Sequence, residues 1–230
     1  YYTDHNTGMA TYFRSHLAGW MKEWTKNYAV KTGVKYNIYD DGLKVYTTID
    51  SRLQQYAENA VSNHMKTLQQ QFFDETARRN RDPWYGEDEN GDLFNDPDYP
   101  ARMMKRTQRY RGLKKQYKDN QDSIDYYLNK PVSMRLFSWN GNIDTMLSPM
   151  DSLKYTKQIL HTGFMSFEPQ TGHIKAWVGG INHTHFQYDH VNKKATRQVG
   201  STFKPLVYAR GLDDDKIQPC EKESTGPVIV

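Results

Sequence analysis

Cysteine is almost absent from this chain, since Cys220 is the single one among 230 residues, and an internal disulfide framework is therefore excluded. Long apolar runs are absent as well: no stretch approaches the roughly 20 residues that cross a bilayer, and no signal peptide is visible. The net charge of +4 is small and indicates a solvated surface. Seventeen tyrosines lie among basic residues, but no recognition motif supports a nucleic-acid partner. With 37% apolar residues, the hydrophobic core must be modest.

The stretch Arg197–Pro205 reads R-Q-V-G-S-T-F-K-P and has the pattern of an acyl-transfer nucleophile. If a helix opens at Ser201, the hydroxyl lies at the positive end of the helix dipole, and the Lys204 amine lies one turn later on the same face. A serine is a weak nucleophile unless a neighbouring base takes its proton. Proline is tolerated in the first turn of a helix, so Pro205 supports a helix start near Ser201. We therefore predict Ser201 as the nucleophile and Lys204 as its base.

Two upstream blocks give this short pattern its context. Residues 163–180 form two apolar runs around a Pro-Gln-Thr-Gly turn, which predicts a β-hairpin. In residues 43–55, the alternation over 45–49 predicts a strand, and Asp50 is a good N-cap for a following helix. The apolar positions of that helix repeat at helical spacing: Leu53, Tyr56, Ala57, Ala60, Val61, His64, Met65 and Leu68.

These three blocks together resemble the transpeptidase domain of bifunctional (class A) penicillin-binding proteins, over roughly residues 36–73 and 160–212. The resemblance implies an α+β chain with a truncated serine DD-transpeptidase (β-lactamase/penicillin-binding) fold, in which 45–49 and 164–178 pair in one antiparallel sheet. It implies that Ser201 attacks the bond between the terminal D-alanines of a peptidoglycan stem peptide, with Lys204 as base and no cofactor or metal. β-Lactams would acylate the same serine, and a glycosyltransferase domain of the parent would use a lipid-linked precursor.

Two further elements of such enzymes do not follow the nucleophile in this sequence. The group also needs an S-x-N motif and a K-T-G strand, both well after the serine. Lys31-Thr32-Gly33 and Ser138-Trp139-Asn140 precede it, and we interpret the first as a helix end and the second as a strand entering an Asn-Gly turn. The chain alone is therefore expected to be inactive, with a poorly packed helix after Ser201.

The resemblance also divides the chain. Residues 1–35 carry an amphipathic helix that resembles a connector or the end of a glycosyltransferase region. Residues 36–73 and 148–230 would be the N-terminal part of the transpeptidase domain. Residues 74–147 would be a small α+β accessory insertion, where other cell-wall synthesis proteins could dock. A periplasmic location follows, with anchoring to the inner (cytoplasmic) membrane only through an N-terminal helix outside this sequence.

Within the insertion, the pattern predicts one basic helix over 102–118, then a hairpin over 132–147 with a type I′ turn at Asn140-Gly141. Ser148, Pro149 and Asp151 then open a further helix. The acidic stretch 82–92 lacks the spacing of a calcium loop.

Three histidines before the nucleophile lie near Asp189, at 183, 185 and 190, but they match no zinc motif, and we predict no metal site. Two alternatives to the transpeptidase remain open. Class D β-lactamases also carry Ser-Thr-Phe-Lys, although they lack the block at 36–73. The chain could also be a non-catalytic interaction module of the cell-wall synthesis machinery.

Overall fold

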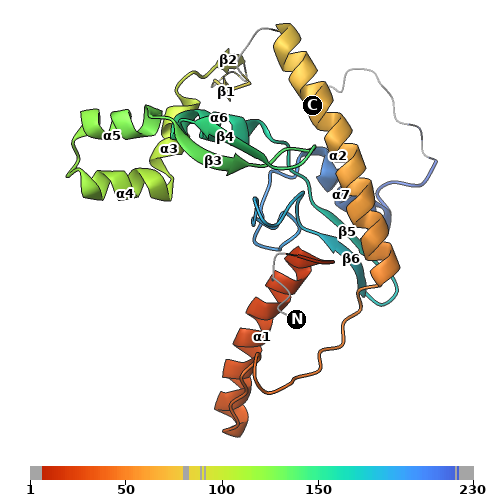
Figure 1. Ribbon diagram of the computed structural model, residues 1–230. Helices are drawn as coiled ribbons and strands as arrows, with labels where there is room; N and C mark the ends of the chain where they lie inside the picture. The colour runs from red at the N-terminus through yellow and green to blue at the C-terminus, as the bar shows by residue number, and fades with distance from the viewer. Residues whose placement is uncertain (1–6, 80–82, 89, 91, 221, 223–230) are drawn as a thin grey trace. The chain divides into compact units, whose positions relative to one another are not determined.

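The computed structural model describes residues 7–79, 83–88, 90, 92–220 and 222 (Figure 1). The described chain is α+β, and its strands form two-stranded antiparallel sheets. It divides into two units, residues 1–192 and residues 193–230. In the part that the structure describes, no helix has the length and apolar character to cross a membrane. The α+β class predicted from the sequence is therefore confirmed, while the transpeptidase fold stays a prediction.

Helix α1 (Thr11–Thr32) ends as the sequence predicted. Gly33 adopts φ 77°, a left-handed conformation that glycine takes without strain, and its N–H donates to the Ala29 carbonyl at 2.9 Å. The Lys31-Thr32-Gly33 tripeptide is thus a helix end, not a substrate-binding strand.

Helix α2 (Ser51–Arg79) begins at the predicted cap. Oδ1 of Asp50 accepts hydrogen bonds from the backbone N–H groups of Leu53 (3.1 Å) and Arg52 (2.9 Å). These bonds, the one from Leu53 foremost, hold the pKa of Asp50 below its ordinary value.

The buried face of α2 differs from the predicted apolar stripe. Leu53 and Tyr56 are 44% and 67% exposed, so this part of the prediction is wrong. The buried positions instead follow each other at spacings of three or four residues, and two of them are glutamines: Gln54, Ala57, Met65 and Gln69, with Val61 packed beside them. The predicted Ala57, Val61 and Met65 do lie on the buried face, but counting only apolar residues missed Gln54 and Gln69, whose polar side chains have fixed partners there.

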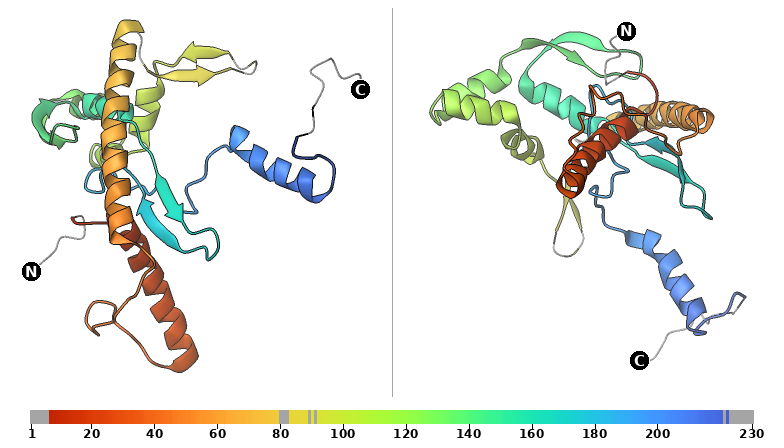
Figure 2. Two further views of the ribbon diagram at one scale, coloured as in Figure 1. Left: turned by 90° about the vertical axis from the view of Figure 1, so that its right-hand side faces the viewer. Right: turned by 90° about the horizontal axis from the view of Figure 1, so that it is seen from below.

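Strands β5 (Phe164–Phe167) and β6 (Ile174–Val178) form the predicted antiparallel hairpin. β6 lies against α2 and shares a small core with it, made of Ala57, Ala176, Val178 and Val61 (Figure 2). This core is the hydrophobic centre of the region that resembles the transpeptidase.

The strand predicted over residues 45–49 is wrong. In the described chain that segment belongs to no strand, although the Thr48 hydroxyl donates to the Ile174 carbonyl (2.7 Å) and the N–H of Asp50, just after it, donates to the Lys175 carbonyl (3.0 Å). Val45 and Tyr46 are 46% and 90% exposed. Alternation predicts a strand only where one face is buried, and here neither face is covered.

In the predicted insertion, α2 is followed by a short hairpin of β1 (Tyr85–Glu87) and β2 (Leu93–Asn95). This hairpin begins within the acidic stretch 82–92 and ends at Asn95, just after it. Residues 82, 89 and 91 lie outside the described residues.

The single basic helix predicted over 102–118 is wrong, because the structure has α3 (Tyr99–Lys105) and α4 (Gln108–Gln116) there. Thr107 separates them with an extended ψ of 154°, and its hydroxyl caps α4 by accepting from the Tyr110 N–H at 3.1 Å. Helix α5 (Gln121–Asn129), capped by Asn120, was not predicted.

Helix α6 (Pro149–Gln158) starts as predicted, with the Ser148 hydroxyl accepting from the Asp151 N–H at 3.0 Å. It contacts α3 and α5 over a second core. That core consists of buried Met104, Ile124 and Leu128 and the partly buried Tyr110, Leu113, Tyr117, Met150 and Leu153.

Strands β3 (Val132–Leu136) and β4 (Ile143–Leu147) pair as a hairpin, as predicted, but the type I′ turn is wrong. The last pair of the ladder is Leu136 with Ile143, so residues 137–142 form a six-residue loop. Ser138-Trp139-Asn140 lies in this loop, where the Asn140 N–H donates to the Ser138 hydroxyl at 3.1 Å.

The Gln54 side chain forms the hydrogen bonds to β6 that the backbone of a neighbouring strand would otherwise form. The fully buried side chain accepts from the Trp177 N–H at 2.7 Å and donates to the Trp177 carbonyl at 2.9 Å. Gln69 does the same between the Leu160 N–H (2.8 Å) and the Gln158 carbonyl (3.0 Å). The two amides therefore join α2 to two segments about a hundred residues later in the chain.

We expect Gln54→Ala to lower the free energy of unfolding by about 2–4 kcal/mol, because it leaves a buried backbone N–H and C=O of Trp177 without partners and opens a cavity. The neighbouring Gln55→Ala, on the exposed side of α2, should change it by less than about 0.5 kcal/mol. Urea titration of both variants measures the difference. Equal values for the two would show that Gln54 does not support β6.

Candidate acyl-transfer site

Ser201 lies in a single 3-10 turn, η1 (Gly200–Phe203), that leads into α7 (Lys204–Asp213). Gly200 precedes the serine with φ 50°, and the Lys204 N–H donates to the Ser201 carbonyl. The α-helix therefore begins at Lys204, three residues after the predicted start, with Pro205 in its first turn. The turn and helix keep serine and lysine one helical turn apart.

The side chains of Ser201 and Lys204 are both exposed. Among the described residues, no hydrogen bond joins the serine hydroxyl to the lysine amine, so the residues predicted to react are adjacent along the turn but not engaged. Acyl transfer also needs donors for the oxyanion, and the Ser201 N–H is the candidate that this turn offers. The arrangement is a nucleophile and a base on one helix start, open to solvent.

The two glycines after β6 permit a close approach of neighbouring side chains. A Cβ on Gly179 would lie 2.3 Å from Oδ1 of Asp189, and one on Gly180 would lie 2.5 Å from the Tyr12 hydroxyl. Tyr12 donates to the Phe186 carbonyl at 2.7 Å, and burial raises the pKa of its hydroxyl well above the ordinary value. The Val-Gly-Gly end of the motif is thus required for packing of α1 against the segment that follows β6.

Asp189 is a structural residue that the sequence reasoning considered only beside a metal. Its carboxylate accepts from the Trp177 indole N–H at 3.0 Å and from the Val191 N–H at 3.0 Å. The signal that could have found it is the glycine pair, since glycines with no turn requirement indicate a close neighbour.

The three histidines of this segment have separate partners. His183 packs edge-on against Tyr12 at 4.8 Å, and Nε2 of His185 lies 2.8 Å from Oδ1 of Asn142. His190 stacks on His161 at 5.4 Å, and burial together with the nearby His190 lowers the pKa of His161. Within the described residues, no three potential ligands are grouped as a metal site.

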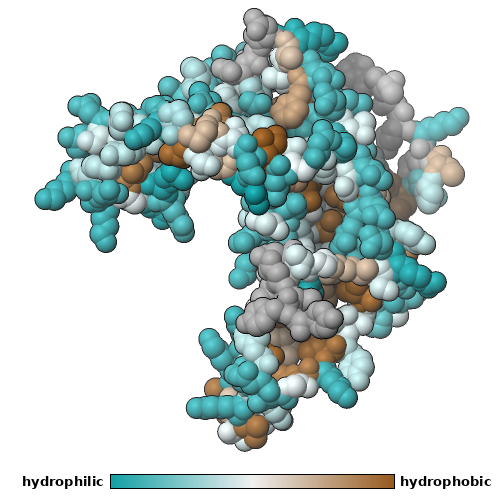
Figure 3. All heavy atoms as spheres, in the orientation of Figure 1, coloured by the Kyte–Doolittle hydropathy of each residue, from teal (hydrophilic) through white to brown (hydrophobic). Residues whose placement is uncertain are grey.

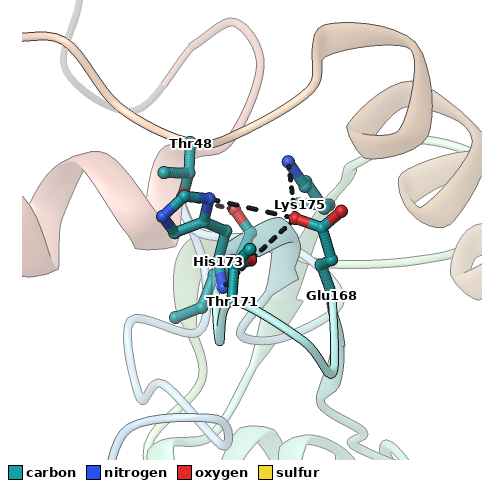
Figure 4. A network of polar contacts seen from close by, with 6 residues as sticks. Thr48, Glu168, Thr171, His173 and Lys175 are labelled. Carbon is teal, nitrogen blue, oxygen red and sulfur yellow. Dashed lines mark hydrogen bonds and ion pairs between the residues drawn. The ribbon is translucent and has the colours of Figure 1, made fainter.

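The Pro-Gln-Thr-Gly turn of the hairpin has a structural role (Figure 4). Oε2 of Glu168 accepts from the Thr171 hydroxyl at 2.7 Å, and Nζ of Lys175 lies 3.7 Å from it. The Thr171 bond, followed by the Lys175 charge, lowers the pKa of Glu168. Gly172 takes φ 72° and donates its N–H to the Glu168 carbonyl at 2.8 Å. This network holds the hairpin turn.

Comparison with known proteins finds two matches. The model of the penicillin-binding protein middle domain matches residues 79–160, which span the second core and its helices. Penicillin-binding protein 1A of Vibrio cholerae serotype O1 is 24% identical over 212 residues, covering 76% of this chain and 24% of that protein. By these two matches, the chain is similar to part of a penicillin-binding protein. It spans about a quarter of the length of the curated relative it matches. No solved structure matches it significantly.

Proposed function

We propose that this penicillin-binding protein cross-links peptidoglycan by serine acyl transfer. Ser201 attacks the carbonyl between the two terminal D-alanines of a stem peptide, D-alanine leaves, and an acyl-enzyme ester forms. An amine of a second stem then attacks the ester and releases Ser201. Lys204 takes the serine proton in the first step.

The observation that carries this proposal is the R-Q-V-G-S-T-F-K-P turn in a chain related to penicillin-binding proteins. Gly200 in the left-handed region and Pro205 in the first turn of α7 fix where the helix begins. The serine therefore lies at a helix N-terminus, where the dipole stabilises a developing negative charge, and the lysine follows one turn later. The family relation supports a role in cell-wall synthesis.

The location, the second domain and the partners of the enzyme are part of the same proposal. The full-length protein is periplasmic, anchored in the inner membrane, carries a glycosyltransferase domain acting on a lipid-linked precursor, and is inhibited by β-lactams. Residues 74–147 are the part that other cell-wall synthesis proteins would contact. The domain boundaries at 35, 73 and 147 stay predictions.

The test is covalent labelling of the full-length protein by a fluorescent penicillin, followed by mass spectrometry of its peptides. The adduct should map to the peptide that contains Ser201. An adduct on another serine would overturn the assignment. The 230-residue chain alone should show no release of D-alanine from a D-Ala-D-Ala peptide, since no S-x-N or K-T-G motif follows Ser201 in it.

The same experiment separates the two alternatives. Rapid hydrolysis of the bound penicillin, with the label lost within seconds, would favour a β-lactamase. A full-length protein that takes no label would favour a non-catalytic interaction module, for which the two packed cores of residues 1–192 would be the functional part.

A further inference from the structure

The positive charge of this chain is concentrated in one short segment. Residues 102–118 contain eight lysines and arginines and no aspartate or glutamate. The whole chain has 31 basic and 27 acidic residues, so the remainder has 23 basic and 27 acidic residues and is net negative. The positive charge is therefore distributed unevenly along the chain, although the net charge is only +4. We call the segment 102–118, which spans the end of α3 and all of α4, the basic segment.

The structure leaves this charge on the surface. No residue of α4 is buried, and hydrophilic residues predominate over the region of α4 and α5, with a few hydrophobic ones among them (Figure 3). Lys114 and Lys115 lie three and four residues after Arg111, so each is its neighbour on the helix surface. In the described part of the chain, Lys114 pairs with Asp119 at 3.2 Å and Arg102 with Asp96, and no other ion pair involves the basic segment.

Such an arrangement is unfavourable for the isolated fold. Like charges at these spacings destabilise a helix. The acidic side chains of the neighbouring α5, Asp122 and Asp125, form no ion pair with α4 among the described residues, and Asp125 accepts from Gln121 instead. An external anionic partner would offset the repulsion.

We propose that the basic segment binds the surface of an anionic phospholipid bilayer. Clusters of four to eight lysines and arginines on a helix are typical of anionic lipid binding, with about 1 kcal/mol for each cation near the surface. A protein interface instead centres on apolar or aromatic residues. The apolar residues of α4, Tyr110 and Leu113, pack inward on the core around Ile124, so α4 presents charge without such a centre.

The same packing decides the mode of binding. Because Tyr110 and Leu113 are engaged in the core, α4 does not insert its apolar side into the lipid. Attraction is electrostatic and acts within a Debye length of the surface, about 8 Å at physiological salt. Binding should therefore disappear at high salt, unlike that of an inserting amphipathic helix.

The experiment is co-sedimentation of the 230-residue chain with vesicles of phosphatidylcholine alone or of equal parts phosphatidylcholine and phosphatidylglycerol. The wild type should bind only the anionic vesicles, and only at low salt. Replacing Arg111, Lys114 and Lys115 by glutamine should lower the partition coefficient roughly 100-fold. The matched control replaces three exposed lysines by glutamine, Lys26 and Lys31 in α1 and Lys35 after it. This variant should bind nearly as the wild type.

Two further variants keep the test decisive. The triple variant Arg111→Lys, Lys114→Arg and Lys115→Arg keeps every positive charge. It should bind the anionic vesicles as the wild type does, whatever small change in helix stability it causes. Ser201→Ala should bind as the wild type, so that failure of this inference is distinct from failure of the proposed function. Equal loss in both triple variants, or binding to soluble polyglutamate but not to vesicles, would overturn the proposal.

Discussion

Ser201→Ala is expected to abolish covalent labelling of the full-length protein by a fluorescent penicillin, because the ester to the drug forms on this hydroxyl. Lys204→Met should slow labelling by about 10²–10⁴-fold, the range that a positioned general base contributes. Lys204 begins α7 three residues after the serine, one turn away, and is the base that the sequence pattern predicts. The measurement is the second-order rate constant of acylation for each variant.

The matched control is Lys216→Met, which removes an exposed lysine from the same unit and should leave the rate constant within a few-fold of the wild type. Circular dichroism of each variant shows whether the fold is kept. If Lys204→Met labels as fast as the wild type while Ser201→Ala does not label at all, the serine assignment stands and the base is another residue.

Local sequence signals predicted the ends of elements well. The caps at Asp50 and Ser148 and the helix end at Gly33 are confirmed, because each depends on the residue itself and a backbone group within four positions. The hairpin over 164–178 is confirmed for the same reason, since its turn is held by Thr171 and Glu168.

Features that depend on distant partners were predicted poorly. The strand over 45–49 fails because its pattern supposes a buried face that the described chain does not provide. Gln54 and Gln69 were missed because a glutamine in a helix looks like a solvated residue, and only its pairing with backbone 89 to 123 positions away makes it part of the core. The break at Thr107 was missed for another reason: its cap is local, on the N–H of Tyr110, but a threonine inside a helical pattern is common and does not mark a break.

The chemistry assigned to Ser201 and Lys204 stays a prediction, and the structure bears only on their spacing. The pattern placed Ser201 and Lys204 one turn apart, and the structure has them so, with the helix starting three residues late. What completes such a site, the second oxyanion donor and the walls of a cleft, depends on segments distant in sequence. No short motif within Arg197–Pro205 could specify those.

Amide hydrogens of residues 201–212 should exchange about 1000-fold faster than those of residues 57–65 in α2, when the 230-residue chain is studied alone. α7 has ten residues and none of them is buried: Leu206 is 62% exposed and Val207 is 56% exposed. Helices shorter than about 12–15 residues are marginal in water without packing, so α7 should open with a free energy near zero. α2 instead contributes Ala57 and Met65 to the interior. A difference of about 4 kcal/mol in opening free energy corresponds to the expected ratio.

The exchange experiment also tests how the candidate site is completed. Apolar surface removed from water stabilises by about 25 cal/mol per Å², so covering Leu206, Val207 and their neighbour Phe203 would slow exchange at the serine turn as well. In the full-length protein we therefore expect residues 201–212 to reach protection comparable to α2. If they are strongly protected already in the 230-residue chain, and remain so on tenfold dilution, other residues of the same chain cover the helix. The exposure of α7 described above would then be wrong. Protection that is lost on dilution would instead show that a second copy of the chain covers α7.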